Sequence, residues 1–218
     1  FAFCKEVEFD ESKKKFYTIK NAKKLDLSKA RFILMRQNPP FNMDYITATF
    51  LLEKIPNTTK ILNDPASVRN MPEKLCSMSF TKFMPPTLFT KEIEEIEKFR
   101  KKYKKIVIKP THGFGGNSIF FVTNKTNRSK ISKHLNKNDH VMVQKFLPQI
   151  KHGDKRIFII DGKVKGAIKR VPKKGSFVSN LGQGGRAIKT TLNKKEMFVA
   201  KKVANYLKKN NILFAGID

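Results

Sequence analysis

Apolar residues recur along the chain with two different periods. In three segments they return every three or four residues, which predicts helices with one buried face. Elsewhere they gather in short runs rich in Ile, Val and Phe, which predict buried strands. We expect helices at 44–54, 65–70, 73–80, 91–104, 127–136 and 193–209, and strands at 31–35, 60–63, 106–110, 118–122, 141–147, 156–161, 163–171 and 212–217.

The pattern changes character after Pro85 and Pro86. Before them, a strand–helix–strand order indicates an α/β layer, whose first strands we expect to lie upstream of residue 1. After them, two strands flank a glycine-rich loop, and two more are joined by the turn signal Asp161-Gly162. Tight turns of this kind join antiparallel strands. We therefore expect an α/β (α+β) chain in which antiparallel sheets follow an α/β layer.

The chain carries a formal net charge of +28. One interpretation is a nucleic-acid or anionic-membrane partner. The alternative is a lysine-rich composition without selection for binding. We favour the alternative, because the lysines are scattered in short groups and do not interleave with aromatic residues as a single-strand binding surface requires. We therefore expect neither a nucleic-acid partner nor a membrane partner.

The two cysteines, Cys4 and Cys76, show neither metal-site spacing nor a disulfide framework. We interpret them as free thiols of a reducing compartment. No apolar stretch approaches the length that crosses a bilayer. Together these features predict a cytoplasmic protein. The chain starts at Phe1 and stops at Asp218 just after an apolar run, so we expect further residues at both ends.

The most informative segment is the loop between residues 109 and 118. Closely spaced glycines let a backbone approach phosphate oxygens and point several N–H groups at them. The loop is not a Walker A loop, because no Lys-Ser or Lys-Thr follows the glycines, and it is not a dinucleotide fingerprint, because a strand follows it. It predicts a flap over phosphates, to which Lys109 can add a point charge. An ordinary glycine-rich hairpin is the alternative.

Several neighbouring motifs now become informative, and they occur in one fixed order. These stretches are Ile33-Leu34-Met35-Arg36, Pro39-Pro40-Phe41, Asn63-Asp64-Pro65, Glu73-Lys74-Leu75, Ile108-Lys109-Pro110, Gly153-Asp154-Lys155-Arg156, Asn180-Leu181, Gly184-Gly185-Arg186 and Gly216-Ile217-Asp218. In this order they resemble the ATP-grasp ligases, and among them the prokaryotic glutathione synthetase family. The resemblance covers the chain from about residue 30 to its end.

The resemblance implies a ligase that joins γ-glutamylcysteine to glycine through an acyl phosphate while ATP is cleaved to ADP and phosphate. It also implies two domains. Residues 1–72 would be the C-terminal part of an N-terminal substrate-binding domain, and residues 73–218 an ATP-grasp domain, truncated at its C-terminus, whose two antiparallel-sheet subdomains clamp ATP. The family is commonly oligomeric, but nothing in the sequence marks an interface, so a homo-oligomer stays open.

The residues that match the family's ATP-binding positions include two lysines, the loop and one strand. A lysine taken alone is far more often a solvated surface residue, so the positions of these lysines within motifs are what select them. The implied ATP contacts are Lys74, Lys109, Gly113, Gly115, Gly116, Ser118, Gln144, Lys145, Phe146, Leu147 and Asp154.

The dipeptide carries two carboxylates, and arginine forks suit both. Arg36, Arg156 and Arg186 match family positions that bind substrate, and the resemblance makes Arg156, Arg186 and Asn180 the catalytic candidates. A structural salt bridge is the alternative for each arginine. Arginine is scarce here and lysine plentiful, so these matches carry more weight than those of the lysines.

The reaction needs Mg²⁺, with Mn²⁺ as an alternative, to bridge the phosphates. Asp218 matches the first metal carboxylate of the family, and its partners, a Glu and an Asn, would lie beyond the last residue. One position departs from the pattern. The family commonly has arginine two residues before Asn180, whereas this chain has Val178, which puts the glycine specificity in question. Another ATP-grasp ligase and a basic nucleic-acid-binding protein are the rival hypotheses.

Overall fold

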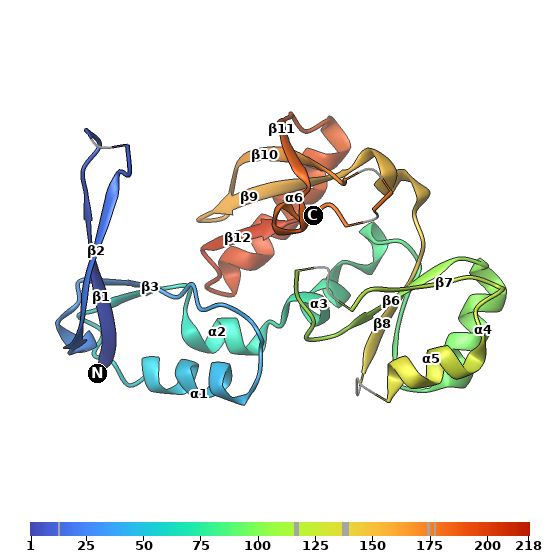
Figure 1. Cartoon of the computed structure of the whole chain (residues 1–218), viewed down its shortest axis with the longest axis horizontal. Coiled ribbons are helices and arrows are strands. Elements are labelled where there is room, and N and C mark those ends of the chain that lie inside the picture. The colour runs from blue at the N-terminus through green and yellow to red at the C-terminus, as the bar shows by residue number, and fades with distance from the viewer. Residues whose placement is uncertain (13, 116–117, 137–139, 174, 177) are drawn as a thin grey trace.

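The computed structural model describes residues 1–12, 14–115, 118–136, 140–173, 175–176 and 178–218 (Figure 1). Its strands form four separate sheets, and six α-helices pack around them within the described part of the chain. The mixed α/β class expected from the sequence is confirmed, and the two larger sheets are antiparallel. No helix among the described residues is both long and apolar enough to cross a membrane.

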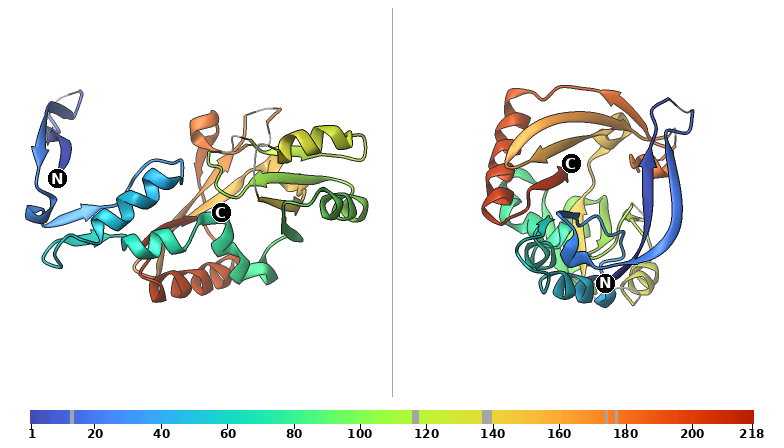
Figure 2. Two further views of the ribbon diagram at one scale, coloured as in Figure 1. Left: turned by 90° about the horizontal axis from the view of Figure 1, so that it is seen from below. Right: turned by 90° about the vertical axis from the view of Figure 1, so that its left-hand side faces the viewer.

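The N-terminal segment is a hairpin of two long strands, β1 (Ala2–Phe9) and β2 (Tyr17–Leu25). Figures 1 and 2 show it projecting away from the rest of the chain. These strands were not predicted, because both faces of the hairpin are largely exposed and no alternation of apolar and polar residues runs through their full length. A short 3-10 helix, η1 (Leu27–Lys29), follows.

The α/β layer consists of the parallel strands β3 (Phe32–Leu34) and β4 (Lys60–Leu62) with two helices. Helix α1 spans Met43–Leu52, and the side chain of Asn42 caps it by accepting a hydrogen bond from the N–H of Tyr45. Helix α2 spans Pro65–Asn70. The expected helix at 73–80 instead divides into α3 (Glu73–Cys76) and the 3-10 helix η2 (Ser77–Phe83), and within η2 the backbone at Phe80 leaves the helical region.

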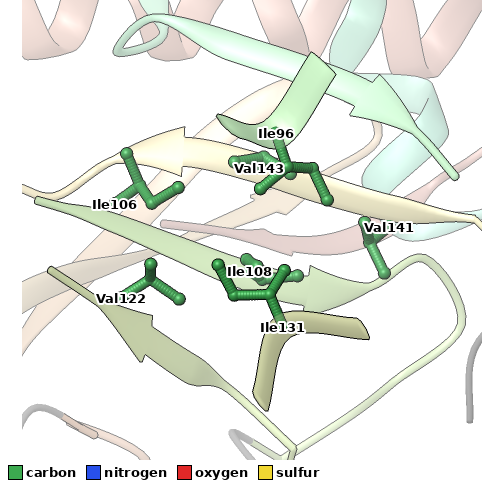
Figure 3. Close-up of a cluster of buried hydrophobic side chains, with 7 residues drawn as sticks. All are labelled: Ile96, Ile106, Ile108, Val122, Ile131, Val141 and Val143. Atoms are coloured by element: carbon green, nitrogen blue, oxygen red, sulfur yellow. The ribbon is translucent and has the colours of Figure 1, made fainter. Parts of the chain in front are cut away.

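The first large sheet has the order β5-β8-β6-β7, and two helices cover one face of it. Its core is a cluster of seven Ile and Val side chains that come from both helices and from three strands (Figure 3). The covering helices supply Ile96 and Ile131, which are fully buried. The elements are β5 (Thr87–Thr90), α4 (Ile93–Tyr103), β6 (Ile106–Pro110), β7 (Phe120–Val122), α5 (Arg128–Leu135) and β8 (Val141–Lys145).

The second large sheet has the order β11-β10-β9-β12 and packs against α6 through Ile159, Ala204, Leu207 and Ile212. Helix α6 begins with a capping box, in which Asn193 and Glu196 satisfy each other's backbone N–H groups. The elements are η3 (Pro148–His152), β9 (Asp154–Ile160), β10 (Lys163–Val171), η4 (Leu181–Gln183), β11 (Arg186–Lys189), α6 (Lys194–Lys209) and β12 (Phe214–Ile217). Strands β5 and β11 were not predicted from the sequence.

Each large sheet therefore has one helix-covered face and one face that carries polar side chains. Side chains alternate along a strand. Ile106 and Ile108 point to the helices, so Lys109 lies on the opposite face of the first sheet. By the same alternation, Arg156 lies on the face of the second sheet opposite to Ile159, which packs with α6. These two polar faces hold Lys109, Gln144, Asp154 and Arg156, four of the residues that the sequence selected.

Candidate active site

On the first sheet, Lys109 is held by a short chain of hydrogen bonds. Its Nζ donates to Oε1 of Gln144 at 2.7 Å, and Nε2 of Gln144 donates to Oγ1 of Thr87 at 2.9 Å. These groups come from β6, β8 and β5, so three neighbouring strands fix one ammonium group. Burial, and secondarily the positive charge of Lys74, lowers the pKa of Lys109. An anion bound next to Lys109 would stabilise its charged form.

Lys74 reaches the same region from α3. Its Nζ donates to the backbone C=O of Gly113, and it lies 3.7 Å from a carboxylate oxygen of Glu73. Its side chain is only 13% exposed, which is unusual for a lysine. Lys74 therefore ties α3 to the glycine-rich loop and brings a second positive charge close to that of Lys109.

The glycine-rich loop follows β6, as expected. Gly115 and Ser118 both have a φ of +66°, a conformation that glycine adopts readily and other residues rarely. Gly113 donates its N–H to the C=O of Pro110, and the ring of His112 stacks on Phe41 at 5.8 Å. Gly116 lies outside the described residues.

The end of β8 forms an apolar corner with β7, at the end of the sheet where β6 begins. The ring of Phe146 packs edge-on against Phe121, with centroids 4.7 Å apart. The backbone N–H of Lys145 donates to Pro86, and that of Phe146 to Lys105. Leu147 is 46% exposed. The segment therefore offers partly open apolar surface next to Gln144, which suits the expected contact with a base.

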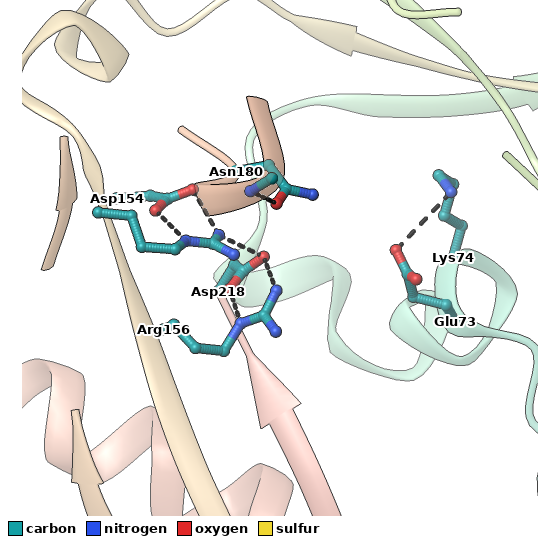
Figure 4. A network of polar contacts seen from close by, with 8 residues as sticks. Glu73, Lys74, Asp154, Arg156, Asn180 and Asp218 are labelled. Carbon is teal, nitrogen blue, oxygen red and sulfur yellow. Dashed lines mark hydrogen bonds and ion pairs between the residues drawn. The ribbon is translucent and has the colours of Figure 1, made fainter. Parts of the chain in front are cut away.

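On the second sheet, four charged side chains form one network (Figure 4). Both carboxylate oxygens of Asp218 bind Arg156, whose Nη2 donates at 3.0 Å. Arg170 binds both oxygens of Asp154, at 2.8 and 2.7 Å, and also lies 2.8 Å from Asp218. Hydrogen bonding to Asp154 is the main factor that raises the pKa of Arg170. Burial raises the pKa of Asp218, but the two arginines outweigh it, so the net pKa is lowered.

The geometry of this network depends on a glycine. Gly153 has a φ of +93°, and a Cβ there would lie 2.2 Å from the backbone oxygen of Arg170. Only glycine lets β9 begin this close to β10, where Asp154 is paired with Arg170 in the strand register. This explains why glycine precedes Asp154 in the Gly-Asp-Lys-Arg motif.

The two polar faces lie within electrostatic reach of each other. The negative charge of Asp218, on the second sheet, acts on Lys109, on the first, and opposes the lowering of the lysine's pKa. The cations Lys74 and Lys109 and the network around Asp218 are therefore parts of one region. This region combines fixed positive charge with backbone N–H groups, the arrangement that binds and neutralises a phosphate chain.

Three expected residues lie at the margins of this region. Arg36 is exposed, and its guanidinium carbon lies 5.3 Å from the ring centroid of Phe214. Arg186 is exposed at the first position of β11, opposite Val171. Asn180 caps η4, with its side chain accepting the N–H of Gly182. Within the part of the chain that the structure describes, these contacts are with neighbouring residues and not with the network.

Sequence reasoning missed Arg170 and the side-chain contacts of Asn63. Arg170 is 8% exposed and joins both carboxylates. The scarcity of arginine, which added weight to the family matches of three other arginines, applied equally to Arg170. Asn63 stood within a recognised motif, but its contacts with Leu213 and Phe214 depend on chain separations of about 150 residues.

Comparison with known proteins now gives a consistent result. Residues 1–69 match the family described as "Prokaryotic glutathione synthetase, N-terminal domain", and residues 73–218 match "Prokaryotic glutathione synthetase, ATP-grasp domain". The glutathione synthetase of Rhodopseudomonas palustris is 40% identical over 205 residues, which cover 93% of this chain and 66% of the relative. That of Mesorhizobium japonicum is 38% identical over 222 residues, covering 100% of this chain and 71% of the relative.

The chain thus spans slightly less than two thirds of the length of the R. palustris protein. Among solved structures, the D-cycloserine synthetase DcsG has a TM-score of 0.64 at 17% identity, covering 87% of this chain and 69% of that one. The ATP-grasp ligase PsnB, complexed with minimal precursor, Mg and ADP, has a TM-score of 0.59 at 15% identity, covering 98% and 71%. At these identities the likeness concerns the fold, and it confirms the expected ATP-grasp architecture.

Proposed function

Because the chain belongs to the prokaryotic glutathione synthetase family, we propose that the protein joins γ-glutamylcysteine to glycine with cleavage of ATP. The cysteinyl carboxylate attacks the γ-phosphorus of ATP, ADP leaves, and an acyl phosphate forms. The amine of glycine then attacks the acyl carbon, phosphate leaves, and the amine loses a proton. The observation that carries the proposal is the pair of buried cations, Lys74 and Lys109, opposite the arginine–aspartate network.

In this proposal Lys74 and Lys109 neutralise the phosphates of ATP, and the loop supplies backbone N–H groups to them. Burial lowers the pKa of Lys109, and an incoming phosphate restores the stability of its charged form. The remaining ATP contacts follow the strand from Gln144 to Leu147, where the base meets backbone groups and the ring of Phe146. Asp154 acts mainly through Arg170, because both of its oxygens are bound there.

We assign the carboxylates of the dipeptide and the developing acyl phosphate to arginines. Arg156 is already near the centre of the region, where its guanidinium is bound by Asp218. Arg36 and Arg186 are exposed and available to an anionic ligand. Asn180 and the glycines that follow it belong to the same side of the site in this proposal. An arginine binds a carboxylate with two parallel hydrogen bonds, which sets both position and orientation.

ATP-grasp enzymes use Mg²⁺ with ATP, and we propose the same for this protein, with Asp218 as one ligand. The described residues do not by themselves assemble a metal site, since no group of three or more His, Cys, Asp or Glu side chains is placed to hold an ion. Asp218 is occupied by Arg156 and Arg170. A metal at Asp218 would therefore require further ligands and a shift of these arginines.

We also propose that the boundary between the substrate-binding part and the ATP-grasp part lies between residues 72 and 73. Pro72 directly precedes α3, and the two family matches end at residue 69 and begin at residue 73. Lys74 would then be among the first residues of the ATP-grasp part.

The test uses the full-length protein and follows ADP release with γ-glutamylcysteine, with and without glycine. We expect release that needs both substrates, with a loss of about a hundredfold in Lys109→Met, because a cation that binds the transferred phosphoryl group is removed. Lys105→Met, an exposed lysine one residue before β6, is the matched control and should keep full activity. ADP release that is independent of the dipeptide would overturn the proposal.

A ligase of the same type with a different acceptor is the second candidate, and Val178 favours it. Val178 stands where the family commonly has arginine, and an apolar side chain cannot bind the carboxylate of glycine. Replacing Val178 by Arg should lower the KM for glycine if glycine is the acceptor. If the wild-type protein turns over a bulkier or less polar amine instead, the donor half of the proposal stands and the acceptor changes.

A further inference from the structure

Among the described residues, the side chain of Asn63 holds the backbone of β12 and of the residue before it on the side that faces away from β9. Oδ1 of Asn63 accepts the backbone N–H of Leu213 at 2.9 Å and that of Phe214 at 2.7 Å. Nδ2 donates to the C=O of Phe214 at 2.9 Å. Two donors meet the oxygen and one acceptor meets the nitrogen, so the pattern fixes the orientation of the amide. Asn63 therefore pairs with β12 as the peptide group of a neighbouring strand would.

The residue that Asn63 holds also contacts Arg36. The guanidinium of Arg36 lies over the ring of Phe214 at a cation–π distance of 5.3 Å. Arg36 and Asn63 both follow the parallel strands β3 and β4, which pair with Leu34 opposite Leu62. Side chains that leave the carboxyl ends of adjacent parallel strands meet at one edge of the sheet. The same strand pair therefore brings both residues to Phe214.

The other end of β12 leads into the charged network. Ile217 pairs with Ile157 on β9, and Asp218 follows directly and binds Arg156. A Cβ at Gly216 would lie 2.8 Å from Cδ of Arg156, so the absence of a side chain lets this arginine cross the strand. Asp218 follows Phe214 by four positions, which corresponds to about 13 Å of extended chain. One short strand thus connects the Arg36 side of the site to the network.

We propose that Asn63 is a positioning residue that sets the geometry of both ends of β12. By holding the backbone of Phe214, it fixes the ring on which Arg36 lies, and it fixes the strand that ends in Asp218. The inference rests on the proposed function, in which Arg36 binds a carboxylate of the dipeptide. Asn63 itself touches no reacting atom.

The test measures binding of γ-glutamylcysteine, without turnover, by calorimetry on the full-length protein. Asn63→Ala and Arg36→Met should each weaken binding about tenfold. The double variant should be little weaker than either single variant, because Arg36 can contribute only when Phe214 is held. If the double variant instead binds the dipeptide about a hundredfold more weakly, the two single losses multiply. The two effects would then be independent, and the inference would be overturned.

Two controls separate positioning from general loosening of the fold. Asn70→Ala, at the exposed end of α2, should leave dipeptide binding unchanged. The affinity of Asn63→Ala for ATP should change by less than about twofold, because Lys74 lies on α3 and Lys109 on β6, and neither contacts β12 through Asn63. An equal loss for ATP and dipeptide would mean a merely structural role and overturn the inference.

If Asn63→Ala fails to fold, Asn63→Asp takes its place in the same cycle. The aspartate keeps an oxygen for the two N–H groups and loses only the donor to Phe214. If the double variant binds the dipeptide no more weakly than either single variant, the inference is supported. If the two losses of affinity multiply, it is overturned. A wild-type protein that binds ATP but not the dipeptide would overturn the proposed function itself, an outcome that the cycle keeps distinct.

Discussion

The two large sheets hold their functional charges by different physical means. The sheet β5-β8-β6-β7 has a fully buried apolar cluster behind it and presents one partly buried lysine, Lys109, through neutral hydrogen bonds. The sheet β11-β10-β9-β12 presents two arginines and two aspartates that neutralise one another. On the first sheet, Lys109 is held by neutral side chains and has no ion-pair partner among the hydrogen bonds described. On the second sheet, each of the four charged side chains is stabilised by a partner of opposite charge. Removing a residue should therefore have different consequences in each.

The largest effect is expected in the apolar cluster. Ile108→Ala should lower the free energy of unfolding by about 3 to 4 kcal/mol, because it removes buried methylene groups and leaves a cavity. Chemical denaturation of the variant, with Val107→Ala on the other face of the same strand as the control, checks this. The free energy of unfolding of Val107→Ala should fall clearly less than that of Ile108→Ala. Equal losses for the two variants would mean that the cluster does not support this sheet.

Removing Arg170 should cost somewhat less, about 2 to 3 kcal/mol in Arg170→Met. Its side chain is 9% exposed, but Asp218 is 44% exposed and water can partly replace the lost partner. Denaturation measures the loss, and Arg186→Met, at an exposed position of β11, is the matched control, expected within about 0.5 kcal/mol of the wild type.

A second replacement should recover part of that loss. Asp154→Leu added to Arg170→Met removes a carboxylate left without its main partner, and we expect about 1 kcal/mol of recovery. The double-mutant cycle of unfolding free energies checks this. If the two losses of unfolding free energy simply add, Arg170 and Asp154 do not depend on each other, and the proposed difference between the two sheets is wrong.

A smaller effect, of opposite sign, is expected for the isolated cation. Lys109→Met should stabilise the protein by about 1 kcal/mol at neutral pH, because it removes a buried charge beside Lys74. The folded pKa of Lys109 is lowered, so the wild-type protein regains stability as pH rises from that value towards about 10.4, the ordinary lysine pKa. The advantage of the variant should shrink over this alkaline window in denaturation series at several pH values. A variant less stable than the wild type at every pH would contradict this prediction.

Sequence reasoning succeeded where a pattern of burial is local. Strand β6 and helix α6 were predicted nearly to their ends, because their apolar residues contact a single packed face. The position of Lys109 after the run Ile106–Ile108 followed from the same pattern. Strand β11, with all four residues exposed, offers no such pattern.

The parts that failed depend on contacts distant in the chain. Arg170 acquires its role only when β10 pairs with β9 and β12 ends nearby. Within the sequence of β10, its being an arginine is all that distinguishes it from its lysine neighbours. The amide of Asn63 meets a strand that begins 151 residues later. In a single sequence, residues that join distant elements can be recognised only through family motifs. A motif indicates which residue matters, but it does not show what that residue contacts.

The projecting hairpin of β1 and β2 has a practical consequence for engineering. Its strands pair with each other in a two-stranded sheet, and Figures 1 and 2 show its tip far from both large sheets. Exposed loop tips tolerate inserted sequence better than any other part of a fold. A peptide tag or a fluorescent label placed at Asp10-Glu11-Ser12 would therefore report on the protein while leaving the ligand region untouched.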